Sequence, residues 1–299
     1  HPEAVRRGMR LQALGNDMIA ALGARSVHPV GLRVGGFHRA PATEEIDALR
    51  RRLEAALAEA EALVAFCAGL DLPDDREREV FTSVALTHPD EYAICEGNIV
   101  SGDGHHIHPS DFDEHFQEFQ VAHSTALHAK LDGRPYLVGP LARVNLNLSQ
   151  LPAAVRSTLS ALPVRFPSHN VFHSIVARAV EIHGAVLRAL ELLEGYREPK
   201  APAVPVRPVE GVAVGASEAP RGLLWHRYEV DDRGRVTRAR IVPPTSQNQS
   251  RIEEDIRISL QRFGLERDDE DLRRRAEMVI RNYDTCIYCA AHFLRVRVH

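Results

Sequence analysis

Cys286 and Cys289 are the residues of this sequence whose types and spacing are best suited to joint chemistry. Two thiols separated by two residues can bind one soft metal ion, because the intervening loop is long enough to direct both sulfur atoms inward. His292 follows three residues later with an imidazole, and Asp284 precedes the pair with a carboxylate. A Cys-x-x-Cys pair by itself fits a structural zinc half-site, a redox pair or another metal. The pair therefore predicts a site and leaves its type open.

The composition is that of an ordinary soluble globular protein, with 299 residues, 44% hydrophobic and 26% charged. The net charge of −4 gives no electrostatic reason to expect nucleic acid or an anionic membrane as a partner. No apolar run approaches the ~18 residues that span a bilayer, and no signal peptide is visible. Four cysteines in so long a chain do not make a disulfide scaffold, so we expect a reducing, cytoplasmic setting.

Helices and short strands must position the cysteine pair. Helical periodicity predicts helices at residues 3–22, 43–68, 109–130, 152–162, 170–196 (the longest), 250–263 and 268–280. Strand-like composition predicts short strands at 80–84 and 92–101 and a hairpin at 223–230 and 236–242. We expect a mainly α fold with small antiparallel β elements (α+β), forming one domain over residues 1–299.

Two segments and one group of histidines have simpler interpretations. Residues 133–145 are expected to form a compact loop, and the proline-rich residues 200–209 an extended connector. Within the expected helix at 109–130, three histidines share no consistent face, so we interpret them as packing or surface residues. They are His115, His123 and His128.

Six short motifs follow one another along the chain. In order they are Arg25-x-x-His28-Pro29 with Gly35-Gly36, Cys95-Glu96-Gly97 with Ile99-Val100-Ser101, Gly139-Pro140-Leu141-Ala142-Arg143-x-Asn145, Glu218-Ala219-Pro220-Arg221-Gly222, Pro244-Thr245-x-Gln247-Asn248, and Asp284-x-Cys286-x-x-Cys289-x-x-His292. This series resembles the large, catalytic subunit of NiFe hydrogenases. It looks most like the cytoplasmic, cofactor-coupled branch that includes the NADP-linked sulfhydrogenases.

The resemblance implies a nickel–iron centre held by four cysteine thiolates from two Cys-x-x-Cys pairs. Cys286 would be a terminal nickel ligand, and Cys289 would bridge nickel to iron. Soft thiolates suit both metals, and their deprotonation couples metal binding to proton release. CO and cyanide ligands on the iron would be installed by maturation proteins. His292 would ligate a Mg²⁺ ion near the C-terminus.

The resemblance also implies roles for residues around the metals. Arg221 would lie over the open metal position, where its guanidinium can hydrogen-bond a cyanide ligand and hold or relay a proton during H2 cleavage. The simpler alternative is an arginine that pairs with an acid at a turn. Asp284 would pair with Arg221 and tune its acidity. Pro220 would shape the pocket wall, and Thr245 would donate a hydrogen bond from its hydroxyl to a cyanide. His28 would support a thiolate or a proton path.

The sequence also departs from the family pattern. Thr285 stands where the family normally has proline. The N-terminal Cys-x-x-Cys, a proton-relaying glutamate and an acidic magnesium ligand are absent, and Cys67 and Cys95 do not replace the missing pair. Either the sequence is the C-terminal part of a longer subunit, or it is a degenerate relative without chemistry.

The resemblance thus predicts reversible oxidation of H2 to protons and electrons. The electrons would leave to an iron–sulfur small subunit and its clusters, and then to NAD(P) through diaphorase subunits. Two alternatives remain open. One is a non-catalytic, hydrogenase-like assembly subunit, and the other is a zinc-binding structural protein that uses the cysteine pair and one or two histidines.

Overall fold

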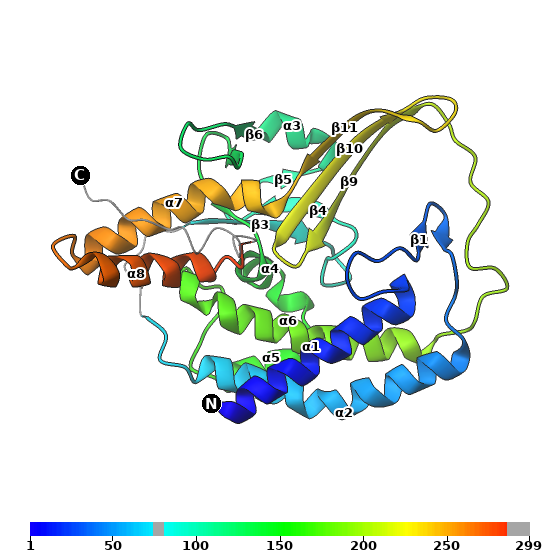
Figure 1. Ribbon diagram of the computed structural model, residues 1–299, viewed down its shortest axis with the longest axis horizontal. Coiled ribbons are helices and arrows are strands. Elements are labelled where there is room, and N and C mark those ends of the chain that lie inside the picture. Colours follow the sequence, from blue (N-terminus) through cyan, green and yellow to red (C-terminus); the bar gives the residue numbers. More distant parts are fainter. Residues whose placement is uncertain (74–80, 286–299) are drawn as a thin grey trace.

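A helical layer lies along one side of a β-rich centre in the computed structural model, which describes residues 1–73 and 81–285 (Figure 1). The layer contains α1 (Pro2–Gly23), α2 (Thr43–Ala68), α5 (Ala153–Ser160) and α6 (Ser174–Glu194). A second helical pair, α7 (Pro244–Phe263) and α8 (Asp269–Arg281), lies side by side away from this layer. The predicted fold class, mainly α with small antiparallel sheets, is confirmed.

Amphipathic patterning explains why α2 packs between α1 and α6. Leu53, Ala60 and Val64 recur on one face of α2 and are fully buried, as expected for an apolar stripe that faces the core. Thr43 is the first helical residue. The Glu45 carboxylate accepts a hydrogen bond from the Ala42 N–H at 2.8 Å, which satisfies a donor at the helix start.

The expected longest helix at 170–196 is shorter than predicted. Asn170 accepts a hydrogen bond from the Phe172 N–H through its side-chain oxygen, and residues Val171–His173 form a 3-10 turn. The α-helix therefore begins only at Ser174 and has 21 residues, against 26 in α2.

A four-stranded sheet of order β5-β4-β3-β8 lies at the centre. Val84 of β3 pairs with Ser101 of β4 in antiparallel register, whereas β3 and β8 are parallel. The strands are β3 (Thr82–Thr87), β4 (Asn98–Ser101), β5 (His106–Ile107) and β8 (Tyr136–Leu137). The segment expected to be a loop at 133–145 instead supplies β8 and then α4 (Pro140–Asn147), whose first residue is a proline, a favoured first residue for a helix.

A separate three-stranded sheet of order β11-β10-β9 rises from the centre (Figure 1). The predicted hairpin is present as β10 (Gly222–Val230) and β11 (Val236–Val242). The third strand, β9 (Gly211–Ala219), was not predicted, and it pairs with β10 from Gly222↔Ala219 to Val230↔Gly211. A two-stranded hairpin, β1 (Leu32–Arg33) and β2 (Gly36–Phe37), follows α1.

The helix predicted at 109–130 is wrong. The chain forms a 3-10 turn, the one-turn α3 (Phe112–His115), and the antiparallel strands β6 (Phe116–Phe119) and β7 (His128–Leu131). Phe112 stacks on Phe116 and on Trp225, with ring centroids 4.3 and 4.7 Å apart. This packing against a strand distant in sequence outweighs the local helical pattern.

The helix expected at 250–263 begins earlier, at Pro244, so the motif Pro244-Thr245 opens α7 instead of preceding it. Over residues 1–73 and 81–285, no helix is long and apolar enough to cross a membrane.

Candidate functional site

The turn at Pro220-Arg221 joins β9 to β10 and lies against the start of α4. Gly222 follows the turn at φ 135°, and a Cβ there would stand 2.6 Å from Val138 Cγ2. Gly139 precedes α4 at φ 119°, and a Cβ there would stand 2.9 Å from the Arg221 carbonyl oxygen. Both positions require glycine, because a side chain would be strained and would collide. The two glycines allow the backbone of the turn to touch the backbone before α4.

Arg143 holds the turn from beneath. Its Nη1 donates to the Ala219 carbonyl at 2.8 Å and its Nη2 to the Pro220 carbonyl at 3.1 Å. The same guanidinium contacts Glu181, at 2.5 and 2.8 Å, and Glu218, at 3.0 Å. A planar, always charged fork suits such multiple contacts. The Arg143 cluster, defined as Arg143, Glu181 and Glu218, thus fixes the backbone that carries Arg221.

Burial sets the protonation behaviour of this cluster. Glu218 has no exposed side-chain surface, and burial raises its pKa to about 7 although Arg143 and the Leu86 N–H oppose the shift. Burial alone would lower the pKa of Arg143, but the Glu181 and Glu218 carboxylates raise it. Burial and Glu181 raise the pKa of Tyr92, whose hydroxyl donates to Glu181 at 2.7 Å. The cluster is a closed network with its hydrogen bonds satisfied.

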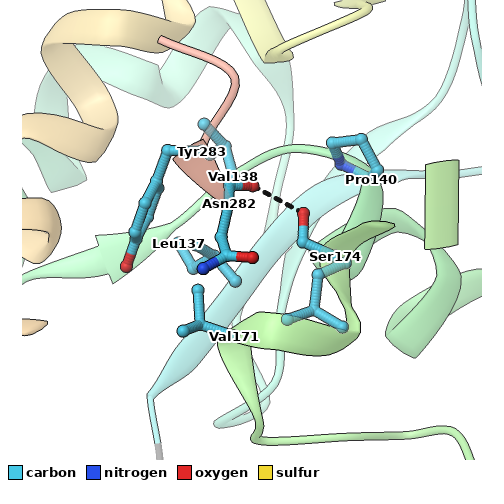
Figure 2. A pocket seen from close by; sticks show the side chains of 8 residues that line it. Leu137, Val138, Pro140, Val171, Ser174, Asn282 and Tyr283 are labelled. Carbon is cyan, nitrogen blue, oxygen red and sulfur yellow. Dashed lines mark hydrogen bonds between the residues drawn. The ribbon is translucent and has the colours of Figure 1, made fainter. Parts of the chain in front are cut away.

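The end of α8 is anchored next to the same turn. Ser174 Oγ donates to the Asn282 carbonyl at 2.7 Å, and the Tyr283 hydroxyl donates to the buried Asp255 carboxylate. Figure 2 shows Ser174, Asn282 and Tyr283 around a small pocket whose other wall includes Pro140 at the start of α4. The chain leaves this anchor at Asp284, at φ 48°.

Arg221 and Asp284 meet between these two supports. Arg221 Nε donates to the Asp284 carbonyl at 2.6 Å and lies 3.6 Å from its carboxylate Oδ2. The Arg221 side chain is 41% exposed. Burial lowers the pKa of Arg178, and the Asp284 carboxylate opposes that shift. The Arg178 guanidinium is therefore a second cation close enough to interact with the Asp284 carboxylate. The pairing expected between Arg221 and Asp284 is present in the structure.

The other predicted site residues lie in different places. Pro220 is exposed in the turn, and Thr245 is half-buried as the second residue of α7. His28 is exposed in the loop after α1, at φ 50°, and its carbonyl accepts from Arg25 Nε at 2.5 Å. In the part of the chain that the structure describes, no hydrogen bond or ion pair joins His28 to Arg221 or Asp284. Cys286, Cys289 and His292 lie outside the described residues.

The remaining cysteines do not form a thiolate pair. Cys67 is buried in α2 among apolar residues, and burial raises the pKa of its thiol. Cys95 is exposed. A buried thiol with a raised pKa is a packing residue.

Sequence reasoning missed the Arg143 cluster as a unit. Arg143 and Glu218 stand in two of the six motifs, but neither was assigned a role, and Glu181 was overlooked as a charge within a long apolar helix. Charged residues inside otherwise apolar segments are the signal that could have found them, because such groups are rarely buried without partners.

The chain is similar in sequence and in fold to known hydrogenase subunits. No protein-family model matches the chain. It is 31% identical over 290 residues to sulfhydrogenase 1 subunit alpha of Pyrococcus furiosus, a match that covers 96% of this chain and 67% of the relative. It is 27% identical over 327 residues to NAD-reducing hydrogenase HoxS subunit beta of Cupriavidus necator, covering 98% and 66%.

Among solved structures, the crystal structure of an NAD+-reducing [NiFe]-hydrogenase in the H2-reduced state matches with a TM-score of 0.79 and 24% identity, covering 97% of this chain and 69% of that one. The fold is therefore that of a NiFe hydrogenase subunit. The chain belongs to the family of NiFe hydrogenase large subunits, and its sequence is similar to the sulfhydrogenase alpha subunits.

Proposed function

We propose that this chain acts as the catalytic subunit in the reversible oxidation of H2 to two protons and two electrons. The electrons would pass to an iron–sulfur small subunit and, through diaphorase subunits, to NAD(P). Relatives named as sulfhydrogenase and NAD-reducing hydrogenase subunits support this proposal. A cytoplasmic location fits the same relatives.

The observation that carries the proposal is the hydrogen bonding of the Arg221 guanidinium. Its Nε is held by the Asp284 carbonyl at 2.6 Å, whereas neither Nη group has a hydrogen bond within residues 1–73 and 81–285. A guanidinium presents its N–H donors in a fixed plane. Among the described residues, Arg221 is thus oriented by Asp284, and its four Nη N–H donors stay available for an anionic ligand, such as a cyanide, or for charge that develops during the reaction.

The metal donors support only part of the proposal. A nickel–iron centre would activate H2, and we assign Cys286 and Cys289 to it as ligands, with CO and cyanides on iron supplied by maturation proteins. Cys67 and Cys95 do not fit as the remaining donors, because one is buried in the core and the other is isolated and exposed. The 299 residues thus offer two of the four thiolates. His292 would hold Mg²⁺.

The chain's own residues suggest a division of labour around the turn. Asp284 Oδ2, 3.6 Å from Arg221 Nε, would balance the guanidinium charge and fix its orientation. Pro220 would form part of the wall, and Thr245 would offer a hydroxyl donor. The Arg143 cluster positions the turn and does not itself touch a ligand in this proposal. His28 remains a candidate for support of a thiolate or a proton path.

One measurement tests the assignment as a whole. The subunit purified from its native source should contain one nickel and one iron atom per chain, measured by elemental analysis, and its intact mass should exceed 33.3 kDa, because two more thiolates are needed. A mass of 33.3 kDa without nickel or iron would overturn the proposal in favour of a non-catalytic or zinc-binding protein.

A variant tests the role of Arg221. Arg221→Lys keeps the positive charge but removes the planar fork, so we expect H2 oxidation to fall about a hundredfold or more while nickel and iron contents stay unchanged. Arg188→Lys is the matched control, because the Arg188 side chain is similarly exposed at 47% and pairs with Glu91 on the surface. Equal activity in the two variants would refute a role for the guanidinium plane.

A further inference from the structure

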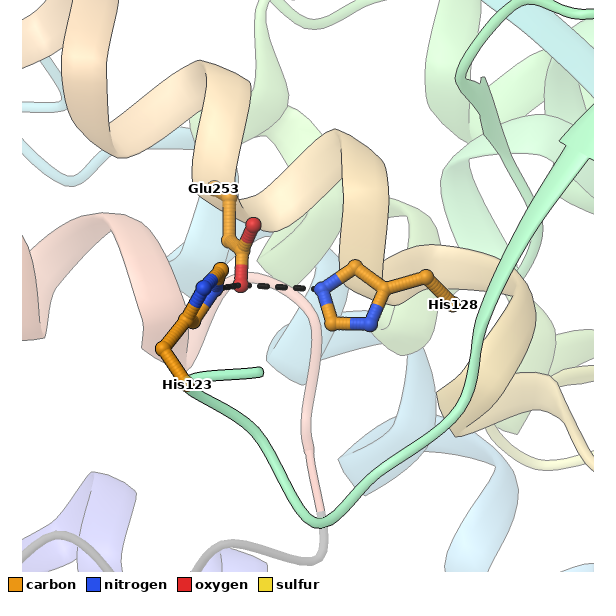
Figure 3. Close-up of side chains that lie close together, drawn as sticks. All are labelled: His123, His128 and Glu253. Atoms are coloured by element: carbon orange, nitrogen blue, oxygen red, sulfur yellow. Dashed lines mark hydrogen bonds and ion pairs between the residues drawn. The ribbon is translucent and has the colours of Figure 1, made fainter. Parts of the chain in front are cut away.

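Three potential metal ligands that are far apart in the sequence meet beside α7. His123 lies in the loop between β6 and β7, His128 is the first residue of β7, and Glu253 lies in α7. Glu253 Oε1 is 2.9 Å from the Nε2 atoms of both histidines. Figure 3 shows the carboxylate between the two rings. Residues 109–130 do not form the predicted helix. The chain turns back between β6 and β7 instead, and this brings the two histidines close together.

Both ring nitrogens of His128 have a defined neighbour. Its Nδ1 lies 3.3 Å from the Ala126 carbonyl oxygen, which can only accept a hydrogen bond. Nδ1 is therefore the donor in this contact. Nε2 is left to face Glu253 Oε1 at 2.9 Å, and a proton or a cation must lie between these two atoms.

Burial and hydrogen bonding favour a metal cation at this place. The His128 side chain is 2% exposed, and an imidazole whose second nitrogen donates to a backbone carbonyl is the usual arrangement of a metal-bound histidine. The ligand atoms of His123, His128 and Glu253 all lie within 4.8 Å of one another. Ligands about 2.1 Å from a tetrahedral zinc ion are about 3.4 Å apart, so small side-chain movements would complete the site.

We propose that His123 Nε2, His128 Nε2 and the Glu253 carboxylate bind one divalent transition-metal ion of the zinc class. Two imidazoles and a carboxylate suit Zn²⁺, and Co²⁺ can substitute because it accepts the same ligands. The His123 side chain is 67% exposed and that of Glu253 is 38% exposed, so solvent can supply a fourth ligand.

The metal would tie the loop between β6 and β7 to α7. β7 already packs against this helix. At the start of the same helix, Gln247 donates to the Leu223 carbonyl and Asn248 to the Val138 carbonyl at 3.0 Å, and both acceptors flank the contact between the Pro220-Arg221 turn and α4. The ion would therefore fix the helix that supports this turn.

Cobalt titration of the full-length, tag-free protein in its native complex, after dialysis against a weak chelator, tests the site. We expect visible absorption of one bound Co²⁺ that Zn²⁺ displaces. His123→Ala should weaken this binding at least tenfold, and because His123 is exposed the fold should be retained. Glu253→Gln, which keeps the volume, should also weaken it. His38→Ala, a control at another exposed histidine, should bind cobalt as the wild type does.

Comparison of wild type with His123→Ala isolates this site from any thiolate site. Equal cobalt affinity in the two proteins would overturn the proposal, and the Glu253 carboxylate would then contact the two histidines without a metal ion. The measurement is independent of H2 oxidation, so it can fail or succeed without regard to the function proposed above.

Discussion

Single residues decide whether the turn that carries Arg221 can form. Gly222 and Gly139 both have positive φ, and each touches the backbone or side chain across the contact between the turn and α4. Arg143 then donates hydrogen bonds to two carbonyl groups of the turn. The position of Arg221 thus depends on three residues that do not themselves face a ligand.

Gly222→Ala should destabilise the protein by about 2–4 kcal/mol, because the new Cβ combines backbone strain with overpacking. That Cβ would stand 2.6 Å from Val138 Cγ2 and 2.8 Å from the Gly139 nitrogen. The free energy of unfolding from urea titrations measures the effect. Gly215→Ala in β9 is the control, since no heavy atom lies within 4 Å of its Cβ position. Similar losses in both variants would contradict the argument.

Glu218 should give the stability a pH dependence of known sign. Its carboxyl titrates at about 7 in the folded protein, against an ordinary value of 4.5. Between these pH values the folded state binds more protons than the unfolded state, so the free energy of unfolding contributed by Glu218 decreases as pH rises through this window. The slope of this contribution reaches at most about 1.4 kcal/mol per pH unit.

Glu218→Gln should remove this slope, because an amide does not titrate. Urea unfolding at pH 5, 6, 7 and 8 gives the measurement, and Glu44→Gln on the exposed face of α2 is the control that retains the slope. Parallel pH profiles for the two variants would show that Glu218 does not titrate in this range.

At the scale of elements, two long amphipathic helices and the hairpin of β10 and β11 could be predicted, whereas the segments at 109–130 and 133–145 could not. The bounds of α1 and α2 agree with prediction to within one or two residues, because local apolar periodicity determines them. The segments at 109–130 and 133–145 were wrong, because packing against Trp225 and pairing with β3 involve residues far away in the sequence. No local pattern contains that information.

The end of α8 is an element-level support that a variant can loosen. Tyr283→Phe removes the hydroxyl that donates to Asp255 and should cost about 1–2 kcal/mol of local stability. Amide hydrogen exchange at residues 282–284 should accelerate about tenfold, with α2 unchanged. Tyr196→Phe, which removes a hydrogen bond to the Pro41 carbonyl, should leave residues 282–284 unaffected. Unchanged exchange in Tyr283→Phe would mean that the Tyr283 hydroxyl does not hold this end.

At the scale of the whole molecule, the candidate site was predictable in its residue types and not in its arrangement. The family resemblance identified Arg221 and Asp284, and their contact is present. The network beneath them was not predicted, because Arg143, Glu181 and Glu218 come from two helices and a strand. Charges in such a network are recognisable only once the elements have been packed together.

The same arrangement has a consequence for the order of events during synthesis. The Arg221–Asp284 bond joins residues 63 apart in the chain, and the Glu218–Leu86 bond joins residues 132 apart. Contacts between distant residues form slowly, because the intervening chain must first be closed into a loop. The Arg221–Asp284 contact can form only after Asp284 has left the ribosome. We therefore expect the region around the Pro220-Arg221 turn to be among the last parts of the described chain to fold.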